Sequence, residues 1–441
     1  MKVLVLNPPF KGRFSRTSRS PAVTKGGTLY YPFWLSYAVG VLDKEGFEVD
    51  FIDAPAERKN LEYVLDRVRS ERPRLVVLDT STPSIYNDVC IAGNIKDIVS
   101  DAFTIAVGTH PSALPVETLS LEKKLDAVAI GEYDYTIRDL ALALRDSGDL
   151  RKVDGIVFRE GEDIIFNKSR PRIENLDELP FVSRVYKKYL NIKNYFFAVS
   201  NYPFAMIITG RGCPARCFFC VYPQTFHDRK YRMRSAESVV DEFEYIVKEL
   251  KIVREIGIED DTFTIDRGRV QKICELLLKR KIHIPWYCNV RVGLDFDTMK
   301  SMKRAGCRMI TVGFEFPGEN MNTLEEMLNF AKEMNTDGAQ FYPLIVYPGT
   351  EAFEWAKNNG YLTTMDYSKW ATEAGGHNCV INLPGLSSKD LVSFCNRATK
   401  EYYIRPRYLI SKLRNLLLRP KEIKIDIIAG KTFLNHLIFD K

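Results

Sequence analysis

Residues 204–220 read FAMIITGRGCPARCFFC and join an apolar run to three closely spaced cysteines. The run 204–209 is followed by Gly210, a pattern that predicts a buried strand ending in a loop. Cys213, Cys217 and Cys220 would then lie on one loop at the carboxyl end of that strand. Strand and helix patterns alternate on both sides of this stretch, so we predict an α/β protein built from parallel βα units.

The spacing of the three cysteines indicates an iron–sulfur site. Three thiolates on one short loop can bind one face of a 4Fe–4S cubane, which leaves one iron without a protein ligand. Structural zinc sites have four ligands, and the nearest further candidate is His227. The other six of the nine cysteines are scattered, which favours buried thiols in a reducing compartment over disulfides. They are Cys90, Cys274, Cys288, Cys307, Cys379 and Cys395.

Residues 1–150 predict a doubly wound, Rossmann-like sheet of the flavodoxin type. Their Val-, Leu- and Ile-rich runs are typical of strands that are buried on both faces of a parallel sheet. Such sheets bind ligands at the carboxyl ends of their strands. The expected strands are 2–7, 48–53, 74–79, 103–107 and 126–130, and the expected helices are 33–45, 61–70, 86–99 and 135–145.

Small polar residues and Gly or Pro turns follow four of these strands. Each segment alone is ordinary turn chemistry, but together at one sheet edge they predict a pocket for a bulky ligand. The candidate lining residues are Asn7, Pro8, Thr80, Ser81, Thr82, Gly108, Thr109, His110, Gly131 and Glu132.

The second half predicts a linker, a partial barrel and a tail. Residues 151–198 would be a linker with short strands at 155–159 and 164–167, and residues 199–365 a partial (β/α) barrel with its chemistry at the carboxyl strand ends. Residues 366–441 would be a mostly helical, basic extension. The expected barrel strands are 204–209, 255–259, 286–291, 309–314 and 339–345, and the expected helices are 236–249, 267–280, 296–304 and 321–334.

Three acidic residues, Glu259, Asp260 and Asp261, end the second barrel strand. Carboxylates there suit an ammonium or ribose partner, while capping of the next helix is the alternative. Arg291 ends the third strand and would contact a ligand or remain solvated.

The cysteine motif, with Phe219 before its last cysteine, resembles the signature of the radical S-adenosylmethionine (SAM) superfamily. Further segments resemble the subgroup with an N-terminal cobalamin-binding domain. The resemblance implies an enzyme that cleaves SAM to a 5′-deoxyadenosyl radical, which abstracts hydrogen from an unactivated carbon, and that takes electrons from a flavodoxin or ferredoxin type of donor. These segments are Asn7-Pro8-Pro9, Gly131-Glu132, Asp260-Asp261-Thr262-Phe263, Val312-Gly313-Phe314-Glu315 and Tyr347-Pro348-Gly349-Thr350.

The resemblance assigns cofactors to the candidate residues. Cobalamin is expected at the edge of the first sheet, but without a histidine ligand to cobalt, because the chain lacks an Asp-x-His-x-x-Gly loop. One βα unit of the subgroup is absent after Glu315, which predicts about five barrel strands. The cluster would be held by Cys213, Cys217 and Cys220, and SAM would lie beside Phe219, Glu259, Asp260, Asp261, Arg291 and Glu315.

Two reactions and one non-catalytic role remain open. Segments 80–84, 31–34 and 53–55 are similar to the hopanoid cyclitol and calditol synthase branch, which implies radical rearrangement or ring formation on a lipid-linked sugar. The alternative reaction is cobalamin-dependent C-methylation. The third possibility is a cluster- and cobalamin-binding protein that does not turn SAM over.

The charge of the chain is concentrated in its tail. The chain has 441 residues and a net charge of +6, and residues 406–441 hold eight Lys or Arg against three Asp or Glu. The rest lacks the broad basic face of a nucleic-acid protein, so we expect a small-molecule or lipid-linked substrate. No apolar run is long enough to span a bilayer and no signal-peptide pattern opens the chain, so we expect a cytoplasmic protein. The Leu-rich tail 409–418 is predicted to pack on the barrel, with contact to the inner membrane face as the alternative.

Overall fold

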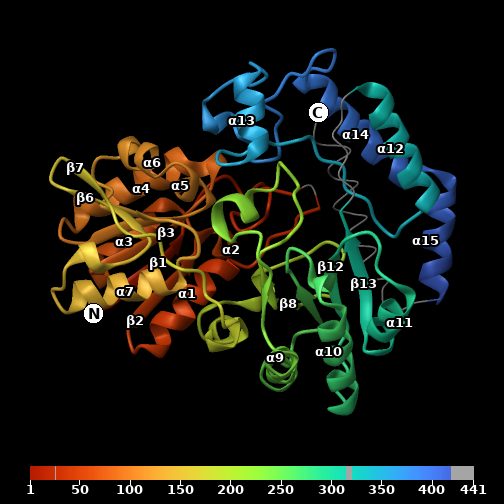
Figure 1. Ribbon diagram of the computed structural model, residues 1–441, viewed down its shortest axis with the longest axis horizontal. Coiled ribbons are helices and arrows are strands. Elements are labelled where there is room, and N and C mark those ends of the chain that lie inside the picture. The colour runs from red at the N-terminus through yellow and green to blue at the C-terminus, as the bar shows by residue number, and fades with distance from the viewer. Residues whose placement is uncertain (25, 314–319, 419–441) are drawn as a thin grey trace.

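The computed structural model describes residues 1–24, 26–313 and 320–418. Its two main sheets, one mostly and one wholly parallel, lie beside one another (Figure 1). The first is a seven-stranded sheet of order β2-β1-β3-β4-β5-β6-β7. Its parallel part confirms the predicted flavodoxin-type order. The strands are β1 (Lys2–Asn7), β2 (Glu48–Asp53), β3 (Leu75–Thr80), β4 (Phe103–Gly108), β5 (Ala127–Ala129), β6 (Ile156–Glu160) and β7 (Asp163–Phe166).

Helices cover both faces of the first sheet, as the doubly wound prediction requires. Helices α1 and α7 pack together, and α4 packs against both α3 and α6. The strands are buried along most of their length, which explains their apolar sequences. The helices are α1 (Phe33–Lys44), α2 (Ala54–Glu57), α3 (Leu61–Glu71), α4 (Ile85–Ile98), α5 (Thr109–Ala113), α6 (Pro115–Leu121) and α7 (Asp134–Arg145).

The two short strands predicted within a linker belong to the first sheet. Strand β6 pairs antiparallel with β5, and β7 pairs antiparallel with β6. A two-stranded hairpin is marginal alone in water, whereas here it extends an existing sheet and covers its β5 edge. The connecting segment therefore begins only after β7. It contains α8 (Val182–Tyr189) and leads to the second sheet.

The second sheet has four parallel strands in the order β13-β12-β11-β8. The predicted helices between them are present, and α9 packs on α10 and α10 on α11. The strands are β8 (Phe204–Ile207), β11 (Glu255–Ile258), β12 (Trp286–Val290) and β13 (Cys307–Val312), and the helices are α9 (Ala236–Glu249), α10 (Arg267–Lys279) and α11 (Phe296–Arg304).

The predicted strand 339–345 is wrong. Residues 338–347 form no regular element, so the second sheet has four strands, rather than about five, among the residues that the structure describes. Pro343 has no backbone N–H to contribute to a strand ladder. At Ala339, the hydroxyl of Tyr403 accepts from the backbone N–H (3.0 Å) and donates to the carbonyl (2.8 Å), which replaces pairing with a neighbouring strand.

The C-terminal extension is helical, as predicted. Helix α14 packs against both α12 and α15. Helix α15 makes this contact through Tyr408, whereas Ile410 and Leu413 are 65% and 62% exposed, so the predicted apolar packing face is not what holds the helix. No helix in the described ranges is long and apolar enough to cross a membrane. The helices are α12 (Met321–Met334), α13 (Glu351–Asn358), α14 (Ser388–Ile404) and α15 (Pro406–Leu418).

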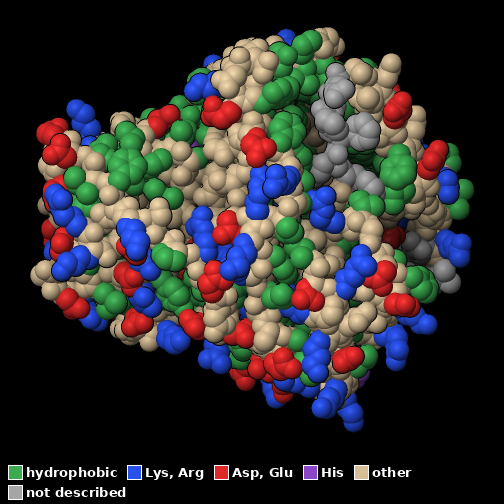
Figure 2. Space-filling model, viewed as in Figure 1, with side chains coloured by type: hydrophobic (Ala, Val, Ile, Leu, Met, Phe, Trp, Pro, Cys, Tyr) green, Lys and Arg blue, Asp and Glu red, His purple; other side chains and the backbone are tan. Residues whose placement is uncertain are grey.

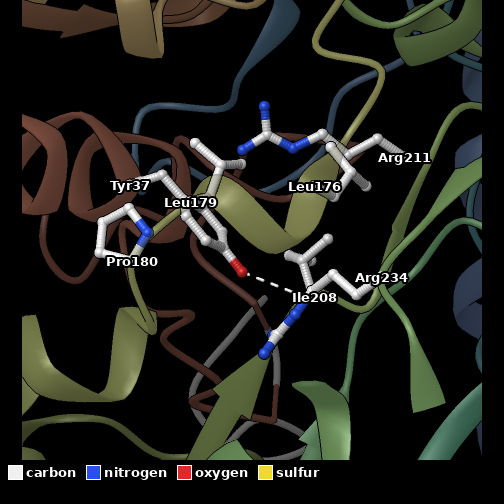
Figure 3. Close-up of a pocket in the computed structure, with 7 residues that line it drawn as sticks. All are labelled: Tyr37, Leu176, Leu179, Pro180, Ile208, Arg211 and Arg234. Atoms are coloured by element: carbon white, nitrogen blue, oxygen red, sulfur yellow. Dashed lines mark hydrogen bonds between the residues drawn. The ribbon is translucent and has the colours of Figure 1, made fainter. Parts of the chain in front are cut away.

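The loop between β1 and α1, residues 8–32, runs between the two sheets (Figure 1). At its end Tyr31 stacks between Tyr186 and Tyr195, and its hydroxyl donates to the carbonyl of Phe204 (2.7 Å). The hydroxyl of Tyr37 donates to the backbone carbonyl of Ile208 (3.2 Å). Both residues line a cavity of about 10 Å³ (Figure 3). This cavity has room for about one water molecule and cannot hold a substrate.

On the outer face shown in Figure 2, charged residues of both signs are interspersed.

Candidate functional site

The cysteine loop follows β8 and is fixed by a short two-stranded ribbon. Strand β9 (Gly210–Arg211) pairs antiparallel with β10 (Arg232–Met233). Gly212 follows with φ of +86°, and a Cβ atom there would lie 2.2 Å from the carbonyl oxygen of Lys230. Only glycine fits this position, both for its backbone angle and for the close approach. The chain is thereby turned so that Cys213 begins the loop.

All three predicted cluster ligands are free thiols on this loop. The Cys213 sulfur lies 3.8 Å from the hydroxyl of Thr262, and the Cys217 sulfur lies 3.5 Å from Nη1 of Arg291. Burial, followed by the charge of Asp261, raises the pKa of the Cys220 thiol to about 12. Binding to iron would therefore have to drive its deprotonation.

The donor set of this loop fits a cluster better than a single zinc ion. Across the described residues, no three His, Cys, Asp or Glu side chains gather in a way that could hold one metal ion. His227, the candidate fourth zinc ligand, is buried and pairs through Nδ1 with Glu132 (2.9 Å). Three separate thiols on one loop, without a fourth ligand beside them, match the requirement of a cubane with one open iron.

Helix α13 supports the cysteine loop from its other side. The backbone N–H of Ala352 donates to the carbonyl of Phe218 (3.1 Å), and that of Glu351 donates to the side chain of Gln224 (2.8 Å). The Gln224 amide in turn donates to the carbonyls of Phe218 and Cys220. The Tyr347-Pro348-Gly349-Thr350 turn, at the start of this helix, thus positions the loop.

Asp260 is a structural residue. Its carboxylate accepts hydrogen bonds from the backbone N–H and the hydroxyl of Thr209, both at 2.6 Å, and so joins the ends of β8 and β11. The helix-capping alternative is wrong for all three carboxylates, because the side chain that caps α10 is Asp266. Asp260 is therefore occupied by its contacts with Thr209.

Glu259 and Asp261 meet a cation from the first domain. Nε of Arg19 lies 3.1 Å from a carboxylate oxygen of Asp261, and its Nη1 lies 3.7 Å from that of Glu259. The amide of Asn289 also donates to Glu259 (3.2 Å). Burial raises the pKa of Glu259, and Arg19 acts in the opposite direction. The site therefore combines two carboxylates, one guanidinium and the cysteine loop.

The remaining residues predicted for SAM have different outcomes. Arg291 is exposed and lies beside Cys217, so the structure brings it to the cysteine loop. Phe219 lies on the loop and packs edge-on against Phe218 (5.9 Å between ring centroids). Glu315 lies outside the described residues.

At the edge of the first sheet, a buried arginine organises the end of β1. Arg16 donates two hydrogen bonds to Asp88, at 3.1 and 2.7 Å, and both side chains are fully buried. It also donates to the side chain of Asn7 (2.8 Å) and to the carbonyl of Pro8 (2.7 Å). These two predicted lining residues thus serve to hold the loop that follows them.

The ends of β3 and β4 approach each other closely. A Cβ atom on Gly108, whose φ is +125°, would lie 2.5 Å from the carbonyl oxygen of Thr80. His110 is buried, and its Nδ1 lies 3.1 Å from the hydroxyl of Thr82, while its Nε2 has no hydrogen-bond partner among the described residues. Burial lowers the pKa of His110 to about 3, so the ring is neutral.

This edge fits a bulky polar ligand in two respects. Glycine at position 108 lets two strand ends come together without side chains, and the buried Nε2 of His110 is a polar atom that a ligand could satisfy. Ser81 and Ser84 bond to each other (2.8 Å), and Thr109 begins α5. Tyr367, from the C-terminal extension, packs edge-on against the His110 ring, with 4.8 Å between the ring centroids.

Glu132 is not available to line this edge. It is buried between the domains, where Arg232 donates to both of its carboxylate oxygens and Nδ1 of His227 donates to one of them. Arg211 lies 3.6 Å away and pairs with Asp134. The predicted cobalamin contact is thus, in this structure, the centre of an ion-pair network that joins the first domain to the cysteine loop. Gly131, the residue before it, donates to the hydroxyl of Ser112.

The sequence interpretation missed Arg19 altogether. The signal available was the length of the β1–α1 loop, because connections beyond about 15 residues without structure are uncommon and are often functional. Thr262, Asn289 and Gln224 were also missed, since short polar side chains at strand ends resemble ordinary turns. Cys90 was predicted to be buried but is exposed, whereas the other five scattered cysteines are buried.

Two family models match the chain in the order that the geometry suggests. The B12 binding domain matches residues 19–141, and the radical SAM superfamily matches residues 207–339. The chain belongs to the radical SAM enzymes that carry an N-terminal B12-binding domain. The B12-binding domain supplies Arg19 and Glu132, and the radical SAM domain supplies the cysteine loop and the carboxylates.

Several known proteins are similar to this radical SAM enzyme over much of its length. An uncharacterized methyltransferase of Pyrococcus horikoshii is 26% identical and aligned over 94% of this chain and 95% of its own. An anaerobic magnesium-protoporphyrin IX monomethyl ester cyclase of Cereibacter sphaeroides is 28% identical over 64% of this chain, which spans about half (47%) of that relative. The structure of the radical SAM methyltransferase TsrM from Kitasatospora setae, with cobalamin and a 4Fe–4S cluster bound, superposes with a TM-score of 0.67 at 17% identity, and covers 92% of this chain and 91% of its own. That likeness confirms the fold.

Proposed function

We propose that the enzyme holds a 4Fe–4S cluster on Cys213, Cys217 and Cys220, SAM beside Glu259 and Asp261, and cobalamin at the edge of the first sheet. When bound, the cluster and SAM would supply a 5′-deoxyadenosyl radical, and cobalamin a methyl group. The chain's own residues orient these groups. Thr262 and Arg291 lie against the sulfurs of Cys213 and Cys217, and Asn289 fixes the Glu259 carboxylate for a cationic ligand.

The B12-binding domain contributes a neutral histidine. His110 would line the corrin pocket rather than bind cobalt, since its partner is Thr82 and the chain lacks the usual histidine loop. Its unsatisfied Nε2 suits a polar group of the ligand. The boundaries that we propose for the units remain 1–150, 199–365 and 366–441, with the β6–β7 hairpin assigned to the first sheet.

We infer C-methylation of a substrate carbon as the reaction. The observation that carries this proposal is the β1–α1 loop, in which Arg16 contacts the edge of the first sheet and Arg19 contacts the carboxylates of the radical SAM domain. The two candidate cofactor sites are therefore neighbours, which transfer of a methyl group from cobalamin to a carbon radical requires. The methyltransferase relative that is aligned over nearly the whole chain supports the same reaction.

Ring formation or rearrangement is the second candidate. It is favoured by the cyclase relatives and by the segments similar to the cyclitol and calditol synthase branch. Both reactions begin with the same hydrogen abstraction, so the residues around the cysteine loop do not separate them.

One experiment tests the enzyme and separates the two reactions. Anaerobically reconstituted protein, given a chemical reductant and SAM, should release 5′-deoxyadenosine, and the triple Cys213→Ala, Cys217→Ala, Cys220→Ala variant should not. Cys90→Ala is the matched control, because Cys90 is a free thiol on the surface of α4, and it should behave as wild type. Equal yield from the triple variant would reject the cluster proposal. With candidate substrates, methyl-labelled SAM should transfer its label in methylation and not in ring formation, and retention of hydroxocobalamin tests the first domain.

We also propose that the substrate is lipid-linked and that α15 contacts the inner membrane face. Exposed apolar side chains on α14 and α15 lie among basic residues, an arrangement that suits an anionic lipid surface. The apolar residues are Ile404, Leu409, Ile410 and Leu413, and the basic ones are Arg405, Arg407, Lys412 and Arg414.

A further inference from the structure

Two arginines of the β1–α1 loop, three residues apart, are held very differently. Arg16 is fully buried and makes a two-pronged contact with Asp88, so it anchors the loop to the first sheet. Arg19 reaches the radical SAM domain, where 37% of its side chain remains exposed. The loop is therefore fixed at one arginine and more loosely attached at the other.

The contacts of Arg19 are single and of moderate length. One nitrogen lies 3.1 Å from Asp261, another 3.1 Å from the carbonyl of Glu259, and a third 3.7 Å from the Glu259 carboxylate. The guanidinium also lies 5.9 Å from the ring of Tyr222. Two-pronged arginine–carboxylate pairs are the strong ones, and partly exposed single contacts contribute little. Arg19 is therefore held less firmly than Arg16, which makes the two-pronged contact with Asp88.

The surrounding charges leave a place for such a cation. Glu259 and Asp261 are two carboxylates facing one guanidinium, and their side chains are only 4% and 8% exposed. Buried carboxylates require a counter-ion, which Arg19 provides in this structure. A ligand that brings its own positive charge would compete for the same oxygens.

We propose that Arg19 is an internal counter-ion that occupies Glu259 and Asp261 until SAM binds, and that SAM, which brings a positively charged sulfonium and an amino group, displaces it. This inference rests on the proposed function. Arg19 lies on the loop that Arg16 ties to the first sheet. Its displacement therefore couples SAM binding to the position of this loop in the B12-binding domain. Arg19 is thus a determinant of SAM affinity, not a catalytic residue.

The test measures binding rather than turnover. Equilibrium dialysis of labelled SAM is performed on cluster-loaded wild-type protein, Arg19→Ala, Arg19→Gln and Arg19→Lys. Removal of the competing charge should tighten SAM binding by roughly three- to fivefold in the Ala and Gln variants, the upper part of the range expected for one partly exposed charge pair. The Lys variant keeps the charge and should stay within about twofold of wild type on the same reasoning. 5′-Deoxyadenosine lacks the amino acid part, so its affinity should not change in any variant.

Lys11→Ala is the matched control, since Lys11 lies on the same loop, carries the same charge and contacts the carbonyl of Thr372 and the ring of Phe10 rather than the two carboxylates. It should bind SAM as wild type does. Unchanged or weaker SAM binding by Arg19→Ala and Arg19→Gln would overturn the inference, as would equal tightening in Lys11→Ala or Arg19→Lys. If cluster-loaded wild-type protein binds no SAM, the proposed function fails, and this inference fails with it.

Discussion

Replacement of Glu132 by alanine should destabilise the protein more than any surface substitution. The change removes a carboxylate that is only 2% exposed and leaves Arg232 and His227 buried without it. Arg232 is poorly placed to adapt, because its Nε already lacks a partner among the described residues. Loss of one member of a buried ion pair costs about 3–5 kcal/mol, which we expect for Glu132→Ala, and somewhat less for Glu132→Gln.

The pH dependence of this effect follows from the pKa of Glu132. Burial alone would raise that pKa, but hydrogen bonds from Arg232 and His227 and the charge of Arg211 together hold it well below its usual 4.5. A carboxyl group with a lowered pKa contributes stability above its unfolded pKa, and this contribution is lost as the pH falls through the folded value. The difference in unfolding free energy between wild type and Glu132→Gln should therefore be largest at neutral pH, and should shrink in acid below about pH 4.5.

Urea unfolding measures the predicted loss of unfolding free energy. Because urea is uncharged, it does not screen the ion pairs of this network. Tryptophan fluorescence follows unfolding, and Trp34 is the reporter at the network, because its ring lies 4.7 Å from that of His227. Asp97→Ala is the control, since Asp97 pairs with Lys124 on the surface, where both side chains are about half exposed or more (61% and 49%). It should change the unfolding free energy by less than about 1 kcal/mol. If Glu132→Ala unfolds at the same urea concentration as Asp97→Ala, the network does not stabilise the interface and our reasoning is refuted.

Three further predictions address the loop, the first sheet and the tail. Gly212→Ala should lower the iron content of reconstituted protein, because its Cβ would meet Lys230, whereas Gly161→Ala, at a positive φ with open space around it, should retain the cluster; equal iron in both would contradict the steric argument. Burial raises the pKa of Asp79 to about 7, although the charge of Arg16 opposes this shift. The protein should therefore lose folding stability as the pH rises from about 4 to 7, because the buried carboxyl group must ionise. Asp79→Asn should therefore raise Tm relative to wild type near pH 8 and leave it unchanged near pH 4, and a pH-independent difference would exclude this assignment. Ile410→Glu with Leu413→Glu should reduce co-sedimentation with phosphatidylglycerol vesicles, whereas Phe166→Glu, an exposed apolar residue on β7, should not; wild-type protein that stays in the supernatant would show that the tail does not bind membrane.

Local patterns predicted most of the elements because both sheets are parallel and buried. Strands such as β1 and β3 must be apolar along their length, and helices such as α9 and α12 show the expected periodicity. The wrong strand at 339–345 had the same apolar composition. What distinguished it was a proline and a partner, Tyr403, that lies 64 residues away in the chain.

The sequence by itself determined the cysteine loop, the order of the two domains and the strand ends at which we expect ligands. These follow from spacing and period, which are properties of neighbouring residues. Only the tertiary structure decided what the charged residues do. Glu132 joins the domains, Asp260 fastens two strands, and Arg19 crosses from one domain to the carboxylates of the other. A carboxylate or guanidinium has no fixed role in a sequence, because its role depends on which opposite charge the fold brings within about 4 Å, where the attraction between two charges in a low dielectric is strong.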